Sequence, residues 1–177
     1  MVFVDECEVH LNPPLTRVWA RRGEPARVPA AGEDKKAAVF GAWNYRTEGF
    51  SWRIEEGKNS ESFLSFLKQL LRHKPRGRRL ILVMDNAGYH RAGKVKEFLE
   101  QHAHDLEPFW LPPYSPELNL IEYVWGYIKQ KATNNYFFGK LKLLVDAVAD
   151  ACRKLNVRED SMLQLHFKTV EHLRQAA

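Results

Sequence analysis

The chain has 177 residues, of which 45% are hydrophobic and 28% are charged. This balance excludes an intrinsically disordered protein and suits one domain with a sizeable core. No apolar run approaches the length of a membrane-spanning helix, and the acidic N-terminus lacks the basic and apolar regions of a signal peptide. We therefore expect an intracellular, cytoplasmic protein without a membrane partner.

The net charge is +5, which fits a polyanionic partner without requiring one. The densest basic segment, 72–79, holds five Lys or Arg and no acid. It is interpreted either as a solvated loop or as a phosphate contact. The two cysteines, Cys7 and Cys152, have no CxxC partner, so we expect them to be reduced and inert.

The first third of the chain predicts a β-meander, and the remainder alternates helices with two further strands. Apolar runs and period-two alternation predict strands at 1–10, 16–21, 36–45, 50–54, 80–84 and 106–111. Helical periodicity predicts helices after a cap at Asn59 or Ser60, over 95–102, after Ser115, over 141–155 and over 161–173. The order β-β-β-α-β-α-β-α predicts an α/β fold, a mixed sheet flanked by helices.

The segment 111–131, LPPYSPELNLIEYVWGYIKQK, predicts the end of a strand followed by a helix. Ser115 is the expected N-cap, with Pro116 in the first helical position. A stripe at helical spacing is expected to face a core, and it consists of Ile121, Val124, Trp125, Ile128 and Ala132. Glu122 lies at the margin of this stripe and shares its side of the helix with Asn119, so a cation is expected opposite it.

Three acids occupy positions where side chains can converge. Asp5 is predicted to end the first strand, Asp85 follows the apolar strand 80–84, and Glu122 opens a helix. Three carboxylates at one edge of a sheet would repel one another, whereas hard divalent cations favour such an oxygen cage. Strand alternation allows only one of Asp5 and Glu6 to point into this site, and we select Asp5 with Glu6 as the alternative.

These residues carry a family resemblance. FVDE at 3–6, VMDNAGYH at 83–90 and LPPYSPELNLIEYVWGYIK at 111–129 resemble the catalytic core of a DDE transposase, of the bacterial insertion-sequence group related to the mariner superfamily. The 36 residues between Asp85 and Glu122 are close to the spacing typical of this group. Leu120 stands where many relatives have proline, which changes no ligand.

The resemblance implies an RNase H-like fold in which Asp5, Asp85 and Glu122 bind Mg²⁺ or Mn²⁺, with two ions per site. It implies hydrolytic cutting at transposon ends and attack of the freed 3′-hydroxyl on target DNA, usually at TA, by a homo-oligomer. We expect residues 1–177 to form one catalytic domain, with the helices from about residue 140 packed on it. The helix-turn-helix region that precedes this core in relatives is expected to be absent, which predicts an excised domain or one reading frame of a split transposase.

Other residues near the three acids have more than one interpretation. Asn86 could orient a carboxylate or touch phosphate, and His90 could contact DNA, steady an acid or simply be exposed. Lys129 could pair with Glu122 or contact phosphate. Trp110, Tyr114 and Trp125 could stack on unpaired bases, although Trp110 and Trp125 are expected to pack in the core instead.

Two rival functions remain open at this point. The first is another RNase H-like nuclease with the same three acids, acting on RNA in hybrids or on DNA junctions. The second is a catalytically silent DNA-binding module derived from a transposase. The third motif argues against the first, and the presence of all three acids argues against the second.

Overall fold

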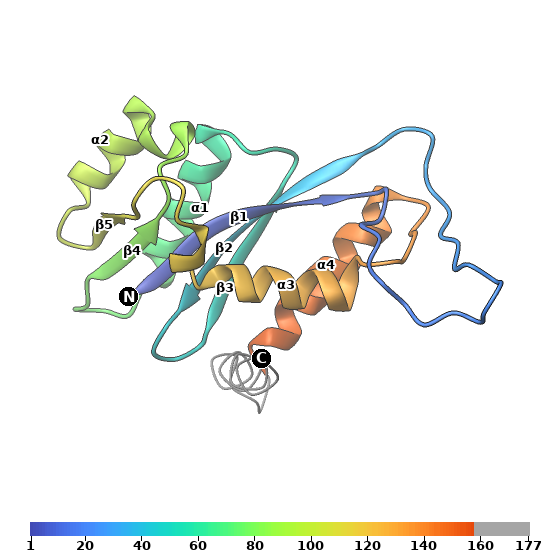
Figure 1. The fold of residues 1–177 in the computed structure, drawn as a ribbon. Helices are drawn as coiled ribbons and strands as arrows, with labels where there is room; N and C mark the ends of the chain where they lie inside the picture. Colours follow the sequence, from blue (N-terminus) through green and yellow to red (C-terminus); the bar gives the residue numbers. More distant parts are fainter. Residues whose placement is uncertain (158–177) are drawn as a thin grey trace.

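The structure is a computed structural model that describes residues 1–157, and its centre is a mixed five-stranded sheet (Figure 1). The strands lie in the order β3-β2-β1-β4-β5, with bounds β1 (Val2–His10), β2 (Lys36–Asn44), β3 (Phe50–Glu55), β4 (Leu80–Met84) and β5 (Leu106–Trp110). Neighbours among the first three strands are antiparallel, whereas β4 runs parallel to β1 and β5 parallel to β4. The predicted mixed sheet and its N-terminal meander are therefore confirmed.

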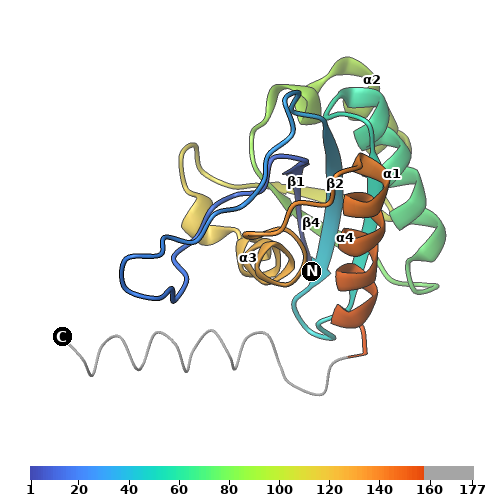
Figure 2. The same cartoon turned by 90° about the vertical axis from the view of Figure 1, so that its right-hand side faces the viewer.

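Helices cover both faces of the sheet (Figure 2). One face packs against α1 (Ser60–His73) and α2 (Gly93–Gln101), and the other against α3 (Ile121–Ala132) and α4 (Leu141–Leu155). Two 3₁₀ turns, η1 (Gly88–Arg91) and η2 (Pro116–Leu118), follow β4 and β5. Along β1, even-numbered apolar residues join the α1/α2 core and odd-numbered ones join the α3/α4 core, as strand alternation requires.

The N-termini of α1 and α3 are built differently. The side chain of Asn59 accepts hydrogen bonds from the backbone N–H groups of Glu61 and Ser62, both at 2.9 Å, which confirms the predicted cap. The predicted cap at Ser115 is wrong: its hydroxyl donates to the carbonyl of Pro113, and the chain makes only η2 before α3 begins at Ile121. Pro116 does occupy the first position of that 3₁₀ turn.

The strand predicted over 16–21 is also wrong. The segment between β1 and β2 leaves the sheet and extends away from the body of the molecule (Figure 1). Its backbone is held by the loop after α3, where Asn135 Oδ1 accepts from the N–H of Thr16 at 2.8 Å. Trp19 is fully exposed, so it does not pack in the core as a residue of a buried strand would.

The remaining elements follow their predicted positions to within a few residues. The helix expected over 161–173 lies outside the described residues. Within residues 1–157, no helix combines the length and the apolar character needed to cross a bilayer. Cys7 and Cys152 are both buried free thiols.

Candidate active site

Adjacent parallel strands bring Asp5 and Asp85 together. The pairing of β1 with β4 sets Val2 beside Leu82 and Phe3 beside Val83, so continuing this register by two positions sets Asp5 beside Asp85. Asp85 follows the last residue of β4, as predicted, but Asp5 does not end its strand. β1 continues to His10 because it keeps pairing with β2 along its whole length.

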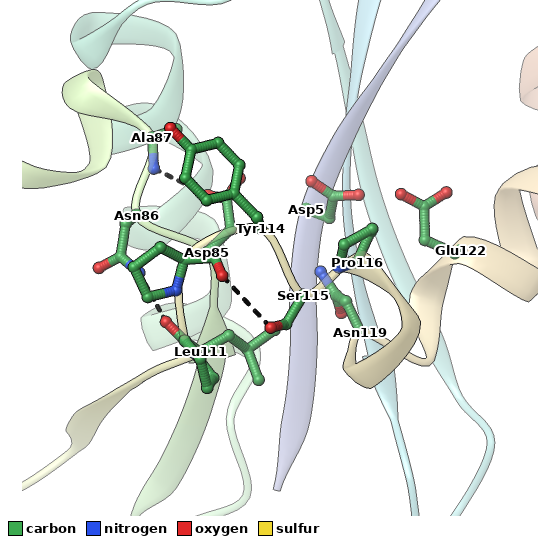
Figure 3. Close-up of a pocket in the computed structure, with 12 residues that line it drawn as sticks. Asp5, Asp85, Asn86, Ala87, Leu111, Tyr114, Ser115, Pro116, Asn119 and Glu122 are labelled. Atoms are coloured by element: carbon green, nitrogen blue, oxygen red, sulfur yellow. Dashed lines mark hydrogen bonds between the residues drawn. The ribbon is translucent and has the colours of Figure 1, made fainter.

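Glu122 reaches the same region from the first turn of α3. Asp5, Asp85 and Glu122 line one pocket of about 450 Å³, whose wall also includes Asn86, Asn119 and the loop after β5 (Figure 3). In Figure 3, Asp5 lies between the other two acids. The three predicted acids thus border one cavity, each supplied by a different element.

Asp5 lies in an environment that disfavours its negative charge. Burial, reinforced by the neighbouring charge of Glu6 and by that of Glu122, raises the pKa of Asp5 to about 7, although hydrogen bonds from the backbone of Glu6 and from Trp125 partly oppose this. The indole Nε1–H of Trp125 donates to Asp5 Oδ2 at 3.0 Å. The charges that repel one another here are those a bound cation would neutralise.

Asp85 is held from the opposite face of the sheet by His90, which is completely buried. His90 Nδ1 lies 2.8 Å from Asp85 Oδ1, at an angle too bent for a regular hydrogen bond, and Nε2 lies 3.2 Å from Glu6 Oε2. Burial lowers the pKa of His90, but Asp85 and Glu6 outweigh it and raise the pKa to about 9. In turn His90 lowers the pKa of Asp85. Glu6 therefore points away from the pocket, as the choice of Asp5 required.

Asn86 joins the ends of β4 and β5. Its Nδ2–H donates to the carbonyl of Leu111 at 2.6 Å, and its Oδ1 accepts from the guanidinium of Arg91. Arg91 also lies over the ring of Trp110, 4.7 Å from its centroid. Asn86 lines the pocket, but these contacts occupy its side chain in holding the loop.

Asn119 and Lys129 flank Glu122 along the chain. Asn119 is 5% exposed, and its Oδ1 has no hydrogen-bond partner within the described part of the chain, which leaves a buried acceptor in the pocket wall. Lys129 approaches the thiol of Cys7, where burial raises the pKa of the thiol and Lys129 partly opposes the rise. Lys129 thus lies against β1, on the face that carries Asp5.

Sequence reasoning treated Trp125 as packing or base stacking and missed its hydrogen bond to Asp5. The residue is buried and does pack, with its ring edge-on to Phe50 at 5.7 Å between centroids. Its indole N–H needs a partner when buried, and that requirement was the available signal. The link between Glu6 and His90 had no sequence signal, because the two residues are 84 positions apart.

The donor set suits a hard divalent cation. Three carboxylates and the unpaired oxygen of Asn119 border one pocket, and Mg²⁺ or Mn²⁺ prefers such oxygen ligands. Across residues 1–157, no three His, Cys, Asp or Glu side chains lie close enough to surround a single ion.

Comparison with known proteins finds similarity to a curated insertion-element protein. The chain is 29% identical over 134 residues to the "Insertion element IS630 uncharacterized 39 kDa protein" of Shigella sonnei; the match covers 76% of this chain and 39% of that protein. The chain therefore spans well under half the length of this curated relative.

Two solved structures share the fold. The Mos1 strand transfer complex matches with a TM-score of 0.61 at 23% identity, over 89% of this chain and 51% of that one. The catalytic core domain of BIV integrase matches with a TM-score of 0.54 at 14% identity, over 78% of this chain and 90% of that one. The expected RNase H-like architecture is confirmed by these similarities.

A family description fits most of the chain. Residues 1–145 match the family described as "DDE superfamily endonuclease", a range that includes all three predicted acids and every element up to the first turns of α4. The match confirms the resemblance drawn from the three sequence motifs. The chain belongs to the DDE superfamily endonuclease family.

Proposed function

We propose that this chain is the catalytic core of a DNA transposase that cuts DNA strands and joins them to a target with the help of divalent cations. The observation that carries the proposal is the convergence of Asp5, Asp85 and Glu122 on one pocket, through the β1–β4 register and the first turn of α3. Membership of the endonuclease family and the likeness to an insertion-element protein support the same substrate class.

Asp5, Asp85 and Glu122 would hold two Mg²⁺ or Mn²⁺ ions. When bound, such ions activate a nucleophilic oxygen and stabilise the leaving oxygen of a phosphodiester. Asp5 must be deprotonated to act as a ligand, and a bound cation would favour that step against the raised pKa of this carboxyl. Trp125 fixes one oxygen of Asp5, and the loop that follows β5 forms the opposite wall of the pocket.

The substrate side of the proposal concerns DNA and assembly. Tyr114 is fully exposed at the rim of the pocket with a positive φ of 58°, a strained conformation of the kind concentrated at functional sites. We propose that Tyr114 contacts a base next to the cut. We also propose that the enzyme works as a homo-oligomer on paired DNA ends, and that it acts in the cytoplasm.

Nicking of supercoiled plasmid in Mg²⁺ or Mn²⁺ tests the proposed activity. We expect the wild-type chain to nick DNA, and Asp85→Asn and Glu122→Gln each to slow nicking by about 100-fold or more, because each removes a charged ligand. Glu100→Gln, an exposed acid of α2 in the opposite layer, is the matched control and should keep full activity.

Three outcomes contradict the proposal in different ways. Equal nicking by wild type and the two site variants would exclude Asp85 and Glu122 as residues of the cleavage site. Preferential cutting of the RNA strand in an RNA–DNA hybrid would favour another RNase H-like nuclease. DNA binding that is lost in salt, with no cleavage under any metal condition, would favour a silent binding module.

A further inference from the structure

His90 lies where a histidine is not needed for packing. It is completely buried on the α1/α2 side of the sheet, with its ring centroid 4.2 Å from that of Phe63 and 4.6 Å from that of Tyr89. The two aromatic rings restrict the rotation of the imidazole. Each nitrogen consequently faces one fixed partner.

Those partners are two carboxylates on different elements. Nε2 lies 3.2 Å from Oε2 of Glu6, whose side chain is 5% exposed, and Nδ1 lies 2.8 Å from Oδ1 of Asp85. Glu6 directly follows Asp5 on β1, whereas Asp85 begins the loop after β4. The histidine therefore links the strand that carries Asp5 to the loop that carries Asp85.

The link restrains a side chain that would otherwise be mobile. The side chain of Asp85 is 52% exposed at the end of a strand, where several rotamers are open to it. Its Oδ1 also accepts from the backbone N–H of Ala87 at 3.0 Å, so both restraints act on the same oxygen. Oδ2 is left as the oxygen available to a cation.

We propose that His90 is a positioning residue that holds Oδ1 of Asp85 so that Oδ2 remains available to the metal, while Glu6 fixes the imidazole. The inference rests on the proposed function, in which Asp85 is a cation ligand. Ligating side chains generally need such outer polar partners, and removing one typically weakens metal binding by about 10- to 100-fold.

Stability alone does not explain the arrangement. A buried ionic network gains little over well-packed apolar residues of similar volume, because removing the charges from water offsets most of their attraction. The space around His90 is lined by the aromatic rings of Phe63 and Tyr89, so apolar side chains in place of both His90 and Glu6 would suit it at least as well. The network instead connects with the pocket through Asp85.

Two substitutions separate the two nitrogens of His90. His90→Asn keeps a side-chain N–H near the position of Nδ1 and loses the contact with Glu6, whereas His90→Gln keeps one near Nε2 and loses the contact with Asp85. Both variants open a similar gap beside Phe63. A purely structural role therefore predicts an effect of His90→Asn at least as large as that of His90→Gln, because Glu6 is buried and Asp85 is half-exposed.

The test is the Mn²⁺ dissociation constant of each variant by isothermal titration calorimetry, alongside urea unfolding in EDTA. We expect His90→Gln to weaken Mn²⁺ binding by about 10- to 100-fold and His90→Asn to stay within about threefold of wild type, since only the latter retains the restraint on Asp85. Glu6→Gln should also stay within about threefold of wild type in Mn²⁺ binding, because the side-chain oxygen of the glutamine still accepts from His90 Nε2. Weakening in His90→Asn that equals or exceeds that in His90→Gln, in step with their loss of stability, would overturn the positioning role and leave the metal site intact.

Asp85→Asn serves as the reference that separates this inference from the proposed function. Wild-type binding that disappears in Asp85→Asn establishes the site on which the histidine variants are compared. Wild-type binding that is absent, or unchanged in Asp85→Asn, would overturn the metal site and the role of His90 together.

Discussion

At the scale of single residues, Asp5 has surroundings that are poorly suited to a negative charge. It is largely buried, with Glu6 beside it on β1 and Glu122 across the pocket, and its pKa is raised to about 7. A group whose folded pKa is above its unfolded value of 3.8 binds its proton more tightly when folded. Its ionisation therefore destabilises the metal-free fold as the pH rises from about 4 to about 7.

This gives the first prediction, for the metal-free protein. Asp5→Asn should be as stable as wild type near pH 4 and more stable at pH 8, by roughly 2 to 4 kcal/mol, because asparagine never acquires the charge. Its side-chain oxygen can still accept from Trp125. Urea unfolding in EDTA at the two pH values measures the difference, and His90 titrates in both proteins alike. A wild type that equals or exceeds Asp5→Asn at pH 8 would contradict the account.

Residue-level patterns in the sequence predicted that three acids share a site, but not the residues that support them. Alternation along β1 places Asp5 and Glu6 on opposite faces of the sheet, as observed, and Asp85, the residue after an apolar strand, lines the pocket. Whether His90 was buried or exposed could not be decided, since that depends on Phe63 from a helix far away in the chain. The local sequence pattern predicts the face of an element on which a side chain lies. Only the tertiary structure shows which residues that side chain contacts.

At the scale of elements, β2 shapes the space behind Asp5. Gly41 is the direct partner of Asp5 across the antiparallel pair, and a Cβ placed on it would lie 2.6 Å from the ring of Trp125 and 2.8 Å from that of Phe50. The absence of a side chain at this position lets Trp125 cross β2 and reach Asp5. The small size of Gly41 thus allows Trp125 of α3 to pack closely against the sheet.

The second prediction compares two glycine substitutions. Gly41→Ala should destabilise the protein by about 1 to 3 kcal/mol, because the added methyl group overpacks the core. Gly126→Ala, on the exposed side of α3 with nothing within 4 Å of its Cβ, should stabilise it by about 0.5 to 1 kcal/mol. Thermal unfolding measures both.

Only Gly41→Ala should also shift the wavelength of tryptophan fluorescence emission, because only this change displaces the ring of Trp125. An equal and favourable effect of the two changes would mean that Trp125 does not pass over Gly41.

Elements with strong periodicity were predicted well, and those defined by contacts were not. The helices α1 and α4 follow from their apolar stripes, and β4 from its continuous apolar run. The segment 16–21 has strand-like residues but no neighbouring strand, because Asn135 holds its backbone instead. Ser115 has a suitable side chain for a cap, yet the 3₁₀ turn that follows gives it no helix to cap.

For the whole molecule, the basic segment 72–79 lies at the end of β4 opposite Asp85. The five residues of β4 separate it from the pocket by roughly 17 Å at the usual rise per residue. Part of its charge is already neutralised, since Lys74 pairs with Asp105 at 2.6 Å and Arg79 with Glu107 at 3.0 Å. These pairs favour the interpretation of a solvated loop.

The third prediction concerns the salt dependence of DNA binding. Lys58, which lies 3.8 Å from Glu8, is near enough to Asp85 to help His90 lower the pKa of that carboxyl, whereas the segment 72–79 adjoins the far end of β4. Lys58→Ser should lower the slope of log affinity against log salt by about 1, whereas Arg76→Ser should leave it unchanged. Fluorescence anisotropy with duplex DNA at several salt concentrations measures the slopes. A loss confined to Arg76→Ser would move the DNA path to the other end of the sheet.

The family and the order of elements along the chain were predictable from three motifs and from hydrophobic periodicity, because both depend on the chain's own pattern. The order of the strands within the sheet required coordinates. The arrangement of the pocket as a whole was only partly predictable: its three acids followed from the motifs, whereas the Trp125 contact and the withdrawal of Glu6 toward His90 required coordinates. Interactions that join distant elements leave no periodic trace in a single sequence.

The proposed function depends most on a cation site built from Asp5, Asp85 and Glu122. Thermal unfolding with added Mn²⁺ tests that site most directly. A ligand that binds only the folded state should stabilise it by roughly 2.7 kcal/mol at 100 times its dissociation constant. We predict saturable stabilisation of the wild type that is lost in Asp85→Asn and Glu122→Gln and kept in Glu100→Gln. Stabilisation that is absent from the wild type, or that survives in both site variants, would contradict the metal site.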